Sequence, residues 1–150
     1  MEFQDASADG QASSFHDAPV PLSSPWGNVQ ECRVIASGLW SVSTGGHGGT
    51  LISEERREAM PAWASHFKTF SGQPTAFEED LDWAVPCAAW AQEFSLEDCL
   101  AAIRTIQGRV SYFTERGLDV DAALQRLATA KLPLREKACA PRRADPGIER

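Results

Sequence analysis

Hydrophobic and polar positions alternate over much of residues 29–52, and this alternation predicts strands. Residues 39–44 (LWSVST) place two apolar side chains on one face of an extended segment, and residues 29–36 (VQECRVIA) contain several β-branched side chains. The Ser-Gly pair at 37–38 predicts a tight hairpin turn between these two segments. Residues 50–52 form either a third strand or the approach to a helix. We therefore expect an antiparallel sheet of two to three strands.

From Ser53 onward the sequence predicts helices. Ser53 precedes two glutamates and is a suitable N-cap for a helix over residues 54–60. Residues 76–90 (AFEEDLDWAVPCAAW) predict two short helical pieces divided near their proline, because a proline inside a helix removes a hydrogen bond. Ser95 and Asp119 can cap two further helices whose apolar residues share one face. The predicted fold is therefore α+β: a small antiparallel sheet followed by a helical C-terminal half.

Composition divides the chain of 150 residues into three parts. Residues 1–25 are rich in Ser, Ala, Asp, Gln and Pro, and residues 132–150 are a basic stretch interrupted by three prolines. Neither end has enough apolar residues to offset the entropy of ordering, so we expect both to be disordered tails that contribute little to the fold. Residues 26–131 are long enough for one hydrophobic core and are predicted to form a single α+β domain.

Acidic side chains dominate the middle of the chain. The net charge is −7, and no Lys or Arg occurs between Lys68 and Arg104. An acidic face repels nucleic acid and favours basic partners. We therefore expect a binding surface made of Glu78, Glu79, Asp80, Asp82, Trp83, Glu93, Glu97 and Asp98. On a helix Glu79 and Trp83 would share a face by their i, i+4 spacing. The commoner explanation is a solvated helix start, with acids near the positive dipole end and Trp83 in the core.

The sequence argues against a membrane protein, a secreted protein and a metal or cofactor site. No window approaches the run of about 18 apolar residues that a membrane helix needs. Residues 1–28 carry four acids and no Lys or Arg, unlike a secretory signal. The four cysteines form no C-x-x-C pair. We expect a cytoplasmic protein with reduced cysteines, no metal and no cofactor, whose core does not bind nucleic acid directly.

Residues 44–50 (TGGHGGT) place four glycines around His47. Glycine permits positive φ angles and a close approach to the backbone, by a ligand or by another part of the protein. The segment lacks the Gly-Lys-Ser/Thr ending of a phosphate loop and the spacing of a dinucleotide fingerprint. His47 is a candidate general base, with Glu79 or Asp80 as its carboxylate partner. The alternative is a structural histidine whose ring hydrogen-bonds a backbone group in a tight turn.

Three motifs occur in order along the chain: SGLWSVSTGGHGG at residues 37–49, ISEERREAMP at 52–61 and FEEDLDWAVP at 77–86. Their order and spacing resemble an uncharacterised domain family of proteobacterial plasmid and phage proteins, over about residues 26–94. The resemblance marks Trp26, Gly27, Ser43, His47, Gly48, Gly49, Glu55, Arg56, Pro61, Glu78, Glu79, Asp80, Trp83 and Ala84. The chain departs from the family pattern at Leu81, where the family has a cysteine, and this argues against that cysteine as an obligatory nucleophile.

The resemblance implies a genomic setting and no mechanism, and it leaves two hypotheses. The first is a mobile-element accessory protein, a counter-defence inhibitor of the anti-CRISPR kind. It would cover the basic surface of a host protein or ribonucleoprotein complex with its acidic, tryptophan-containing surface. The second is a small enzyme of unknown reaction whose site joins His47 to Glu79 or Asp80. Inhibition is the first choice because small acidic proteins of phages and plasmids often act in this way.

Overall fold

The computed structural model of the chain describes residues 15–130, so the expectations for residues 1–14 and for the basic stretch 132–150 lie outside the described residues. The fold is α+β, as predicted, with a four-stranded and a two-stranded antiparallel sheet before a helical C-terminal half. The strands are β2 (Ser23–Ser24), β3 (Gly27–Asn28), β4 (Glu31–Ala36), β5 (Leu39–Ser43), β6 (Gly48–Ile52) and β7 (Ala76–Glu78). The helices are α2 (Glu54–Glu58), α3 (Ala84–Ala89), the 3-10 turn η2 (Ala91–Glu93), α4 (Leu96–Gly108), α5 (Val110–Glu115) and α6 (Val120–Ala130).

The larger sheet has the strand order β4-β5-β6-β7, and every neighbouring pair is antiparallel. The predicted hairpin turn is confirmed, since Ala36 pairs with Leu39 and Gly38 between them has a φ of 74°. Residues 50–52 belong to a third strand. The fourth strand, β7, lies where a helix was predicted, and that prediction is wrong. Three residues are too few to show an alternating pattern, and β7 is specified by its pairing with β6.

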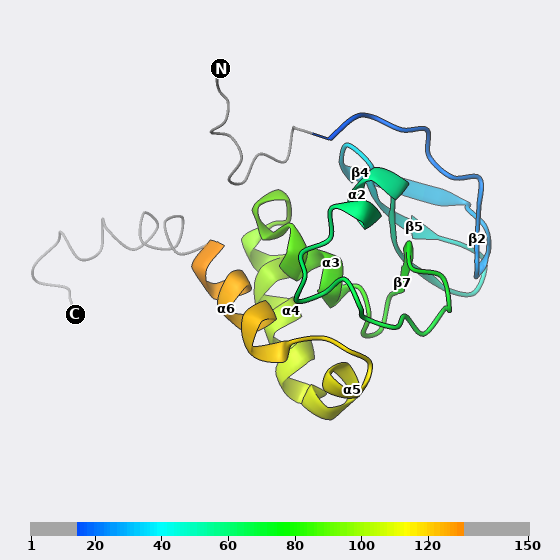
Figure 1. Cartoon of the computed structure of the whole chain (residues 1–150). Helices are drawn as coiled ribbons and strands as arrows, with labels where there is room; N and C mark the ends of the chain where they lie inside the picture. The colour runs from blue at the N-terminus through cyan, green and yellow to red at the C-terminus, as the bar shows by residue number, and fades with distance from the viewer. Residues whose placement is uncertain (1–14, 131–150) are drawn as a thin grey trace, which may run out of the picture.

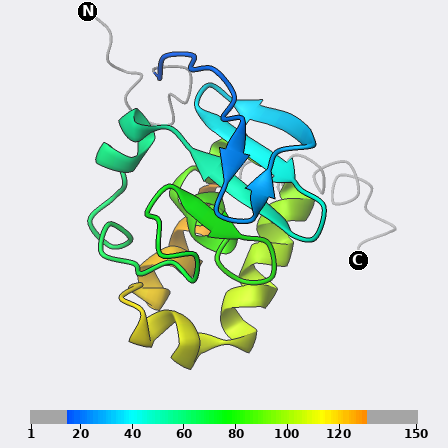
Figure 2. The ribbon, with the colours of Figure 1, turned by 90° about the vertical axis from the view of Figure 1, so that its right-hand side faces the viewer.

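Both faces of this sheet pack against other parts of the chain. The register places Leu39, Ile52 and Phe77 on one face, where they join the main core with α3, α4 and α6. The opposite face carries Trp40, Val42, Leu51 and Ala76, which form a second, smaller core cluster. Figure 1 shows the helices on one side of the sheet and the N-terminal segment on the other, and Figure 2 views the sheet from the side of that segment. The described part of the chain therefore has three layers.

The N-terminal segment of residues 15–29 is the third layer. Ala18, Val20, Trp26 and Val29 pack against the second core cluster, and β2 pairs with β3 through Ser23 and Asn28. The structure thus differs from the boundary at residue 26, because residues 15–25 already contact the core. Composition alone could not indicate this, since two or three apolar residues do not form a periodic pattern. They pack on the far face of the sheet because this face is apolar, and its burial stabilises the fold.

Three helices are capped at their N-termini by side chains that the sequence predicted. The Ser53 side chain caps α2 by accepting from the Arg56 backbone N–H at 3.2 Å, and Ser95 caps α4 by accepting from the Asp98 N–H at 2.9 Å. Asp119 accepts from the Ala122 N–H at 3.1 Å at the start of α6. These three predicted caps are confirmed. They are predictable because a capping side chain and its partner lie only three residues apart.

Residues 76–90 do not form the two helical pieces expected from their sequence. After β7 the chain turns through residues 79–83, and a single helix, α3, contains Pro86 as its third residue. The N–H groups of the first helical turn have no partner within the helix, so a proline is tolerated there. Glu79 and Trp83 therefore do not share a helical face.

Candidate functional site

A cleft of about 660 Å³ opens between the helix-facing side of the large sheet and the start of the helical half. Strands β4, β5 and β6 form one wall, with Glu31, Arg33, Ser41, Ser43 and Thr50. The other wall is formed by Glu79, Trp83, Phe94 and Asp98. We define these residues as the acidic cleft, because three carboxylates and a single arginine line it.

The sheet wall of the acidic cleft is polar although the same face is apolar further along. Arg33 pairs with Ser41, and Ser41 pairs with Thr50, so the three side chains form a row across the sheet. Two residues away along the strands, Leu39 and Ile52 lie on this face beneath the helices. The polar row marks the part of the face that the helices leave open.

Glu79 is held over β6 by the glycine beneath it. Its backbone N–H donates to the Gly48 carbonyl at 3.1 Å. A Cβ on Gly48 would lie 3.1 Å from the Glu79 Oε1 and 2.5 Å from the Val42 carbonyl oxygen. Any side chain on Gly48 would therefore displace the strand or the carboxylate. The absence of a side chain at this position places the Glu79 carboxylate against the sheet.

The glycine-rich segment allows close approach and does not use positive φ angles. The glycines with positive φ are Gly27, Gly38, Gly72 and Gly117, so that part of the prediction is wrong for residues 45–49. At Gly49 a Cβ would lie 2.6 Å from the Trp26 Cη2 and would also meet the Phe77 carbonyl. The close approach that the sequence predicted is made by Trp26, another part of the chain.

Three of the predicted binding residues come together in the acidic cleft. Glu79 is exposed, whereas Trp83 and Asp98 are half-buried. Glu31 and Arg33 complete the cleft from β4, and neither was predicted from the sequence. The sequence contained one signal for this part of the cleft, the serines Ser41 and Ser43 in the alternating segment 39–43. Polar residues on the face of a strand that turns toward the helices indicate that the helices do not cover that face.

Asp82 is not part of the surface, and its assignment to the binding residues is wrong. Its side chain is fully buried. It accepts hydrogen bonds from the Phe70 backbone N–H at 2.6 Å and from the Tyr112 hydroxyl at 2.7 Å. Burial raises the pKa of Asp82, and these two hydrogen bonds oppose that rise. Asp82 ties the loop after Phe67 to α5 in the interior of the protein.

The Glu93 side chain is also buried, and it pairs with Arg56. Both Glu93 oxygens accept from the Arg56 guanidinium, at 2.8 and 2.9 Å, and the Ser37 carbonyl accepts a third bond at 2.7 Å. The side chains of Arg56 and Glu93 are 0% and 6% exposed. A bidentate pair of this kind satisfies a buried guanidinium. The prediction of Glu93 as a surface acid is therefore wrong.

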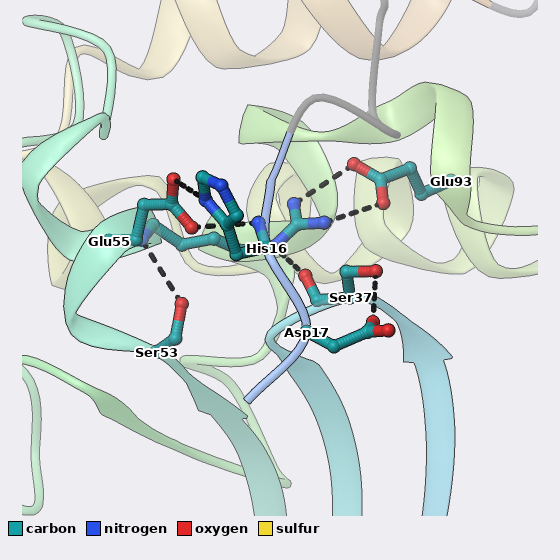
Figure 3. A network of polar contacts seen from close by, with 7 residues as sticks. His16, Asp17, Ser37, Ser53, Glu55 and Glu93 are labelled. Atoms are coloured by element: carbon teal, nitrogen blue, oxygen red, sulfur yellow. Dashed lines mark hydrogen bonds and ion pairs between the residues drawn. The ribbon is translucent and has the colours of Figure 1, made fainter. Parts of the chain in front are cut away.

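The N-terminal segment closes over this ion pair. The Phe15 ring lies 4.1 Å and the Trp90 ring 4.9 Å from the Arg56 guanidinium carbon. Figure 3 shows His16 beside Glu55 and Asp17 beside Ser37. The Glu55 carboxylate accepts from the His16 backbone N–H at 2.9 Å, and this bond lowers the pKa of Glu55. The resemblance marked Glu55 and Arg56, and both belong to this closure.

The remaining predicted acids lie outside the acidic cleft. Glu78 is half-buried, and its carboxylate accepts from the Asp80 N–H at 2.9 Å and the Leu81 N–H at 3.3 Å. Burial raises the pKa of Glu78. Asp80 and Glu97 are exposed acids. Each is adjacent in sequence to an acid that lines the cleft, Asp80 to Glu79 and Glu97 to Asp98. The predicted acidic face is thus divided between the cleft, the surrounding surface and the interior.

His47 is exposed at the tip of the β5-β6 turn and does not line the cleft. Its carbonyl accepts from the Thr44 N–H at 2.8 Å and from the Thr44 hydroxyl at 2.7 Å, and its own N–H donates back to that hydroxyl at 3.2 Å. Within residues 15–130 the imidazole ring makes no hydrogen bond or ion pair. The enzyme hypothesis required a hydrogen bond between this ring and Glu79 or Asp80. The described residues contain no such bond.

Among the described residues, no group of three or more His, Cys, Asp or Glu side chains is arranged to hold a metal ion. No helix in that part of the chain is long and apolar enough to cross a membrane.

A protein-family model matches residues 19–115 of the chain, and its description is a domain of unknown function, DUF7007. The match begins in the N-terminal segment and ends with α5, so it spans both walls of the acidic cleft. No curated protein and no solved structure matches the chain. The resemblance to an uncharacterised domain family is confirmed, and the match extends beyond residues 26–94 at both ends.

Proposed function

The chain belongs to the DUF7007 family, and from that premise we propose that it is a binding protein which inhibits a host nucleic-acid-binding complex through the acidic cleft. One observation supports this most. Glu31, Glu79 and Asp98 line the same concave site as the half-buried Trp83. Carboxylates beside an aromatic ring provide both the charge and the surface that bind basic side chains.

The charge of the whole chain supports the same proposal. A net charge of −7 repels nucleic acid and attracts the positive grooves in which proteins bind phosphates. An acidic protein that occupies such a groove excludes the nucleic acid by competition. The carboxylates must then be spaced so that the lysines and arginines of the groove can bind them.

The biological setting comes from the resemblance of the three sequence motifs to plasmid and phage proteins. In that setting a small acidic binding protein acts in the bacterial cytoplasm as a counter-defence factor, of the anti-CRISPR kind. Its partner is a host protein or ribonucleoprotein complex with a basic surface. The proposal requires no cofactor and no catalytic step.

The test begins with the full chain carrying an affinity tag in a bacterial host, from which bound proteins are purified and identified. The affinity of the purified partner is then measured by calorimetry at several salt concentrations. Glu79→Gln with Asp98→Asn removes two charges from the cleft and should weaken the complex at least about tenfold, because charge-assisted bonds contribute roughly 1.5–3 kcal/mol each.

The matched control is Glu58→Gln with Glu115→Gln, which removes two charges from exposed positions outside the cleft. This variant should bind within about twofold of the unchanged protein, because exposed charges away from an interface contribute little. Equal weakening by both double variants would contradict a specific role for the cleft. A purified chain without a stoichiometric partner would contradict the proposed inhibition.

A further inference from the structure

Thr50 is a buried polar residue in the wall of the acidic cleft. It is 5% exposed, and its register opposite Ser41 and Phe77 directs its side chain to the helix-facing side of the sheet, where the cleft lies. Among residues 15–130 its hydroxyl makes no hydrogen bond. Most buried hydroxyl groups in proteins are hydrogen-bonded, so a hydroxyl that has no partner within the chain and faces a cleft is available to a ligand group.

Further acceptors line the same cleft. The Glu79 carboxylate lies over Gly48, which is two residues before Thr50 on the same strand and therefore on the same face. Ser41 is the direct cross-strand neighbour of Thr50. Asp98 and the Trp83 side chain line the opposite wall. The cleft thus offers hydroxyl and carboxylate oxygens on two walls together with an aromatic side chain.

The charge in the cleft is not balanced from within. Its lining contains three carboxylates, from Glu31, Glu79 and Asp98, and one guanidinium, from Arg33. In the described part of the chain none of these four side chains forms an ion pair. An anion or a sugar would leave this surplus of negative charge uncompensated, whereas a cation would neutralise part of it.

We propose that the Thr50 end of the acidic cleft binds the guanidinium group of an arginine side chain that a partner protein inserts. This inference rests on the proposed function and specifies the partner group. Guanidinium is planar, has five N–H donors and no acceptor, and stacks on aromatic rings. It can donate to the Thr50 hydroxyl and the Glu79 carboxylate at the same time while its plane lies on Trp83. The compact ammonium group of lysine forms no such stack.

The direct test is an NMR titration of the full ¹⁵N-labelled chain with the peptide acetyl-Gly-Arg-Gly-amide. We expect saturable shifts of the Ser41, Thr50 and Glu79 amide signals and of the Trp83 indole N–H signal. The lysine peptide should bind at least about fivefold more weakly, because it cannot stack or fork. The citrulline peptide, which has the same shape without charge, should give no saturable shift. Equal binding of the arginine and lysine peptides, or no saturation with either, would overturn the inference.

Thr50→Val tests the hydroxyl itself, since valine has nearly the same shape. It should weaken binding of the arginine peptide about tenfold, as expected for a hydrogen bond to a charged group. Thr50→Ser keeps the hydroxyl and should bind like the unchanged chain. The control Thr114→Val changes an exposed threonine on α5. Unchanged binding by Thr50→Val would disprove the role of the hydroxyl. If that variant does not fold, the comparison of Thr50→Ser with Thr50→Ala decides in its place.

The failure of this inference and the failure of the proposed function give different results. A partner complex that is weakened by Glu79→Gln with Asp98→Asn but not by Thr50→Val would retain the acidic cleft and remove the arginine site. A complex that neither variant weakens would contradict the proposed function. The peptide titration would then still decide whether the cleft binds guanidinium.

Discussion

Asp82 is a carboxyl group in the interior, between the loop that follows Phe67 and helix α5. The Phe70 N–H and the Tyr112 hydroxyl each donate to one of its oxygens. Burial raises the pKa of Asp82, and burial together with the bond to Asp82 raises the pKa of Tyr112. The pair therefore connects the stability of the fold to pH.

Tyr112→Phe should destabilise the protein by about 1–3 kcal/mol at pH 7, because the buried Asp82 carboxyl group loses one of the two hydrogen bonds that it accepts. The folded-state pKa of Asp82 is raised above its unfolded value. The folded state therefore binds the proton more readily, and its stability increases as the pH falls through the raised pKa. Loss of the Tyr112 bond raises this pKa further, so the deficit should be smaller at about pH 4.5 than at pH 7.

Urea unfolding at the two pH values measures this difference. In an Asp82→Asn background, Tyr112→Phe should cost the same at both, because the titrating group is absent. A deficit in the Asp82 protein that does not change with pH would show that the carboxyl is not the cause.

Single residues could be predicted from the sequence where their partners are local. The caps Ser53, Ser95 and Asp119 were predicted correctly because each bonds an N–H three residues ahead. The acids between residues 78 and 98 look equivalent in the sequence. Asp82 and Glu93 are buried because of partners 30 and 37 residues away, and local patterns contain no information about such pairs.

At the scale of elements, the strands and helices with clear periodicity or a clear cap were predicted, and the short strands β2, β3 and β7 were not. The hairpin of β4 and β5 and the helices α4 and α6 follow from alternation and helical spacing. Strand β7 has three residues and exists because of its pairing with β6. One wall of the acidic cleft could be predicted from the sequence, because it contains the acids Glu79 and Asp98. The residues that β4 contributes to the other wall could not, because their position depends on sheet register.

Gly49→Ala tests how tightly the elements pack on the far face of the sheet. The new Cβ would meet Trp26 and the Phe77 carbonyl, so the strand or the indole must move. We expect a loss of about 1–3 kcal/mol, the usual cost of overpacking. In thermal unfolding the control Gly46→Ala should have a small effect, since nothing lies within 4 Å of its Cβ. Equal stability of the two variants would contradict the close packing of Trp26.

At the scale of the whole molecule, the sheet lies between the helices and the N-terminal segment. Composition predicted that residues 1–25 contribute little, but Ala18 and Val20 pack against the second core cluster and Phe15 lies over Arg56. The segment could not be recognised from sequence because its contacts are long-range and its own hydrophobicity is low.

A chain shortened to begin at Pro25 should therefore unfold at a temperature at least about 4 °C lower, which corresponds to roughly 1 kcal/mol or more in a domain of this size. The loss comes from the exposure of the Trp40 and Val42 face and of the Arg56 ion pair. Differential scanning calorimetry measures it. A chain that lacks only residues 2–14 keeps all the described contacts and should differ little. An unchanged unfolding temperature on starting at Pro25 would show that residues 15–24 do not stabilise the fold.

The Arg56 ion pair also constrains the order in which the newly made chain can fold. Arg56 leaves the ribosome soon after strands β4, β5 and β6. Its carboxylate partner Glu93 follows 37 residues later. Burying a guanidinium without its counter-charge costs several kcal/mol, so α2 cannot settle on the sheet before Glu93 has emerged. Phe15, the first described residue to be synthesised, can close over the pair only after that. The segment that begins at Phe15 therefore waits for a residue made much later, and a fragment that ends before Glu93 should not reach the native fold.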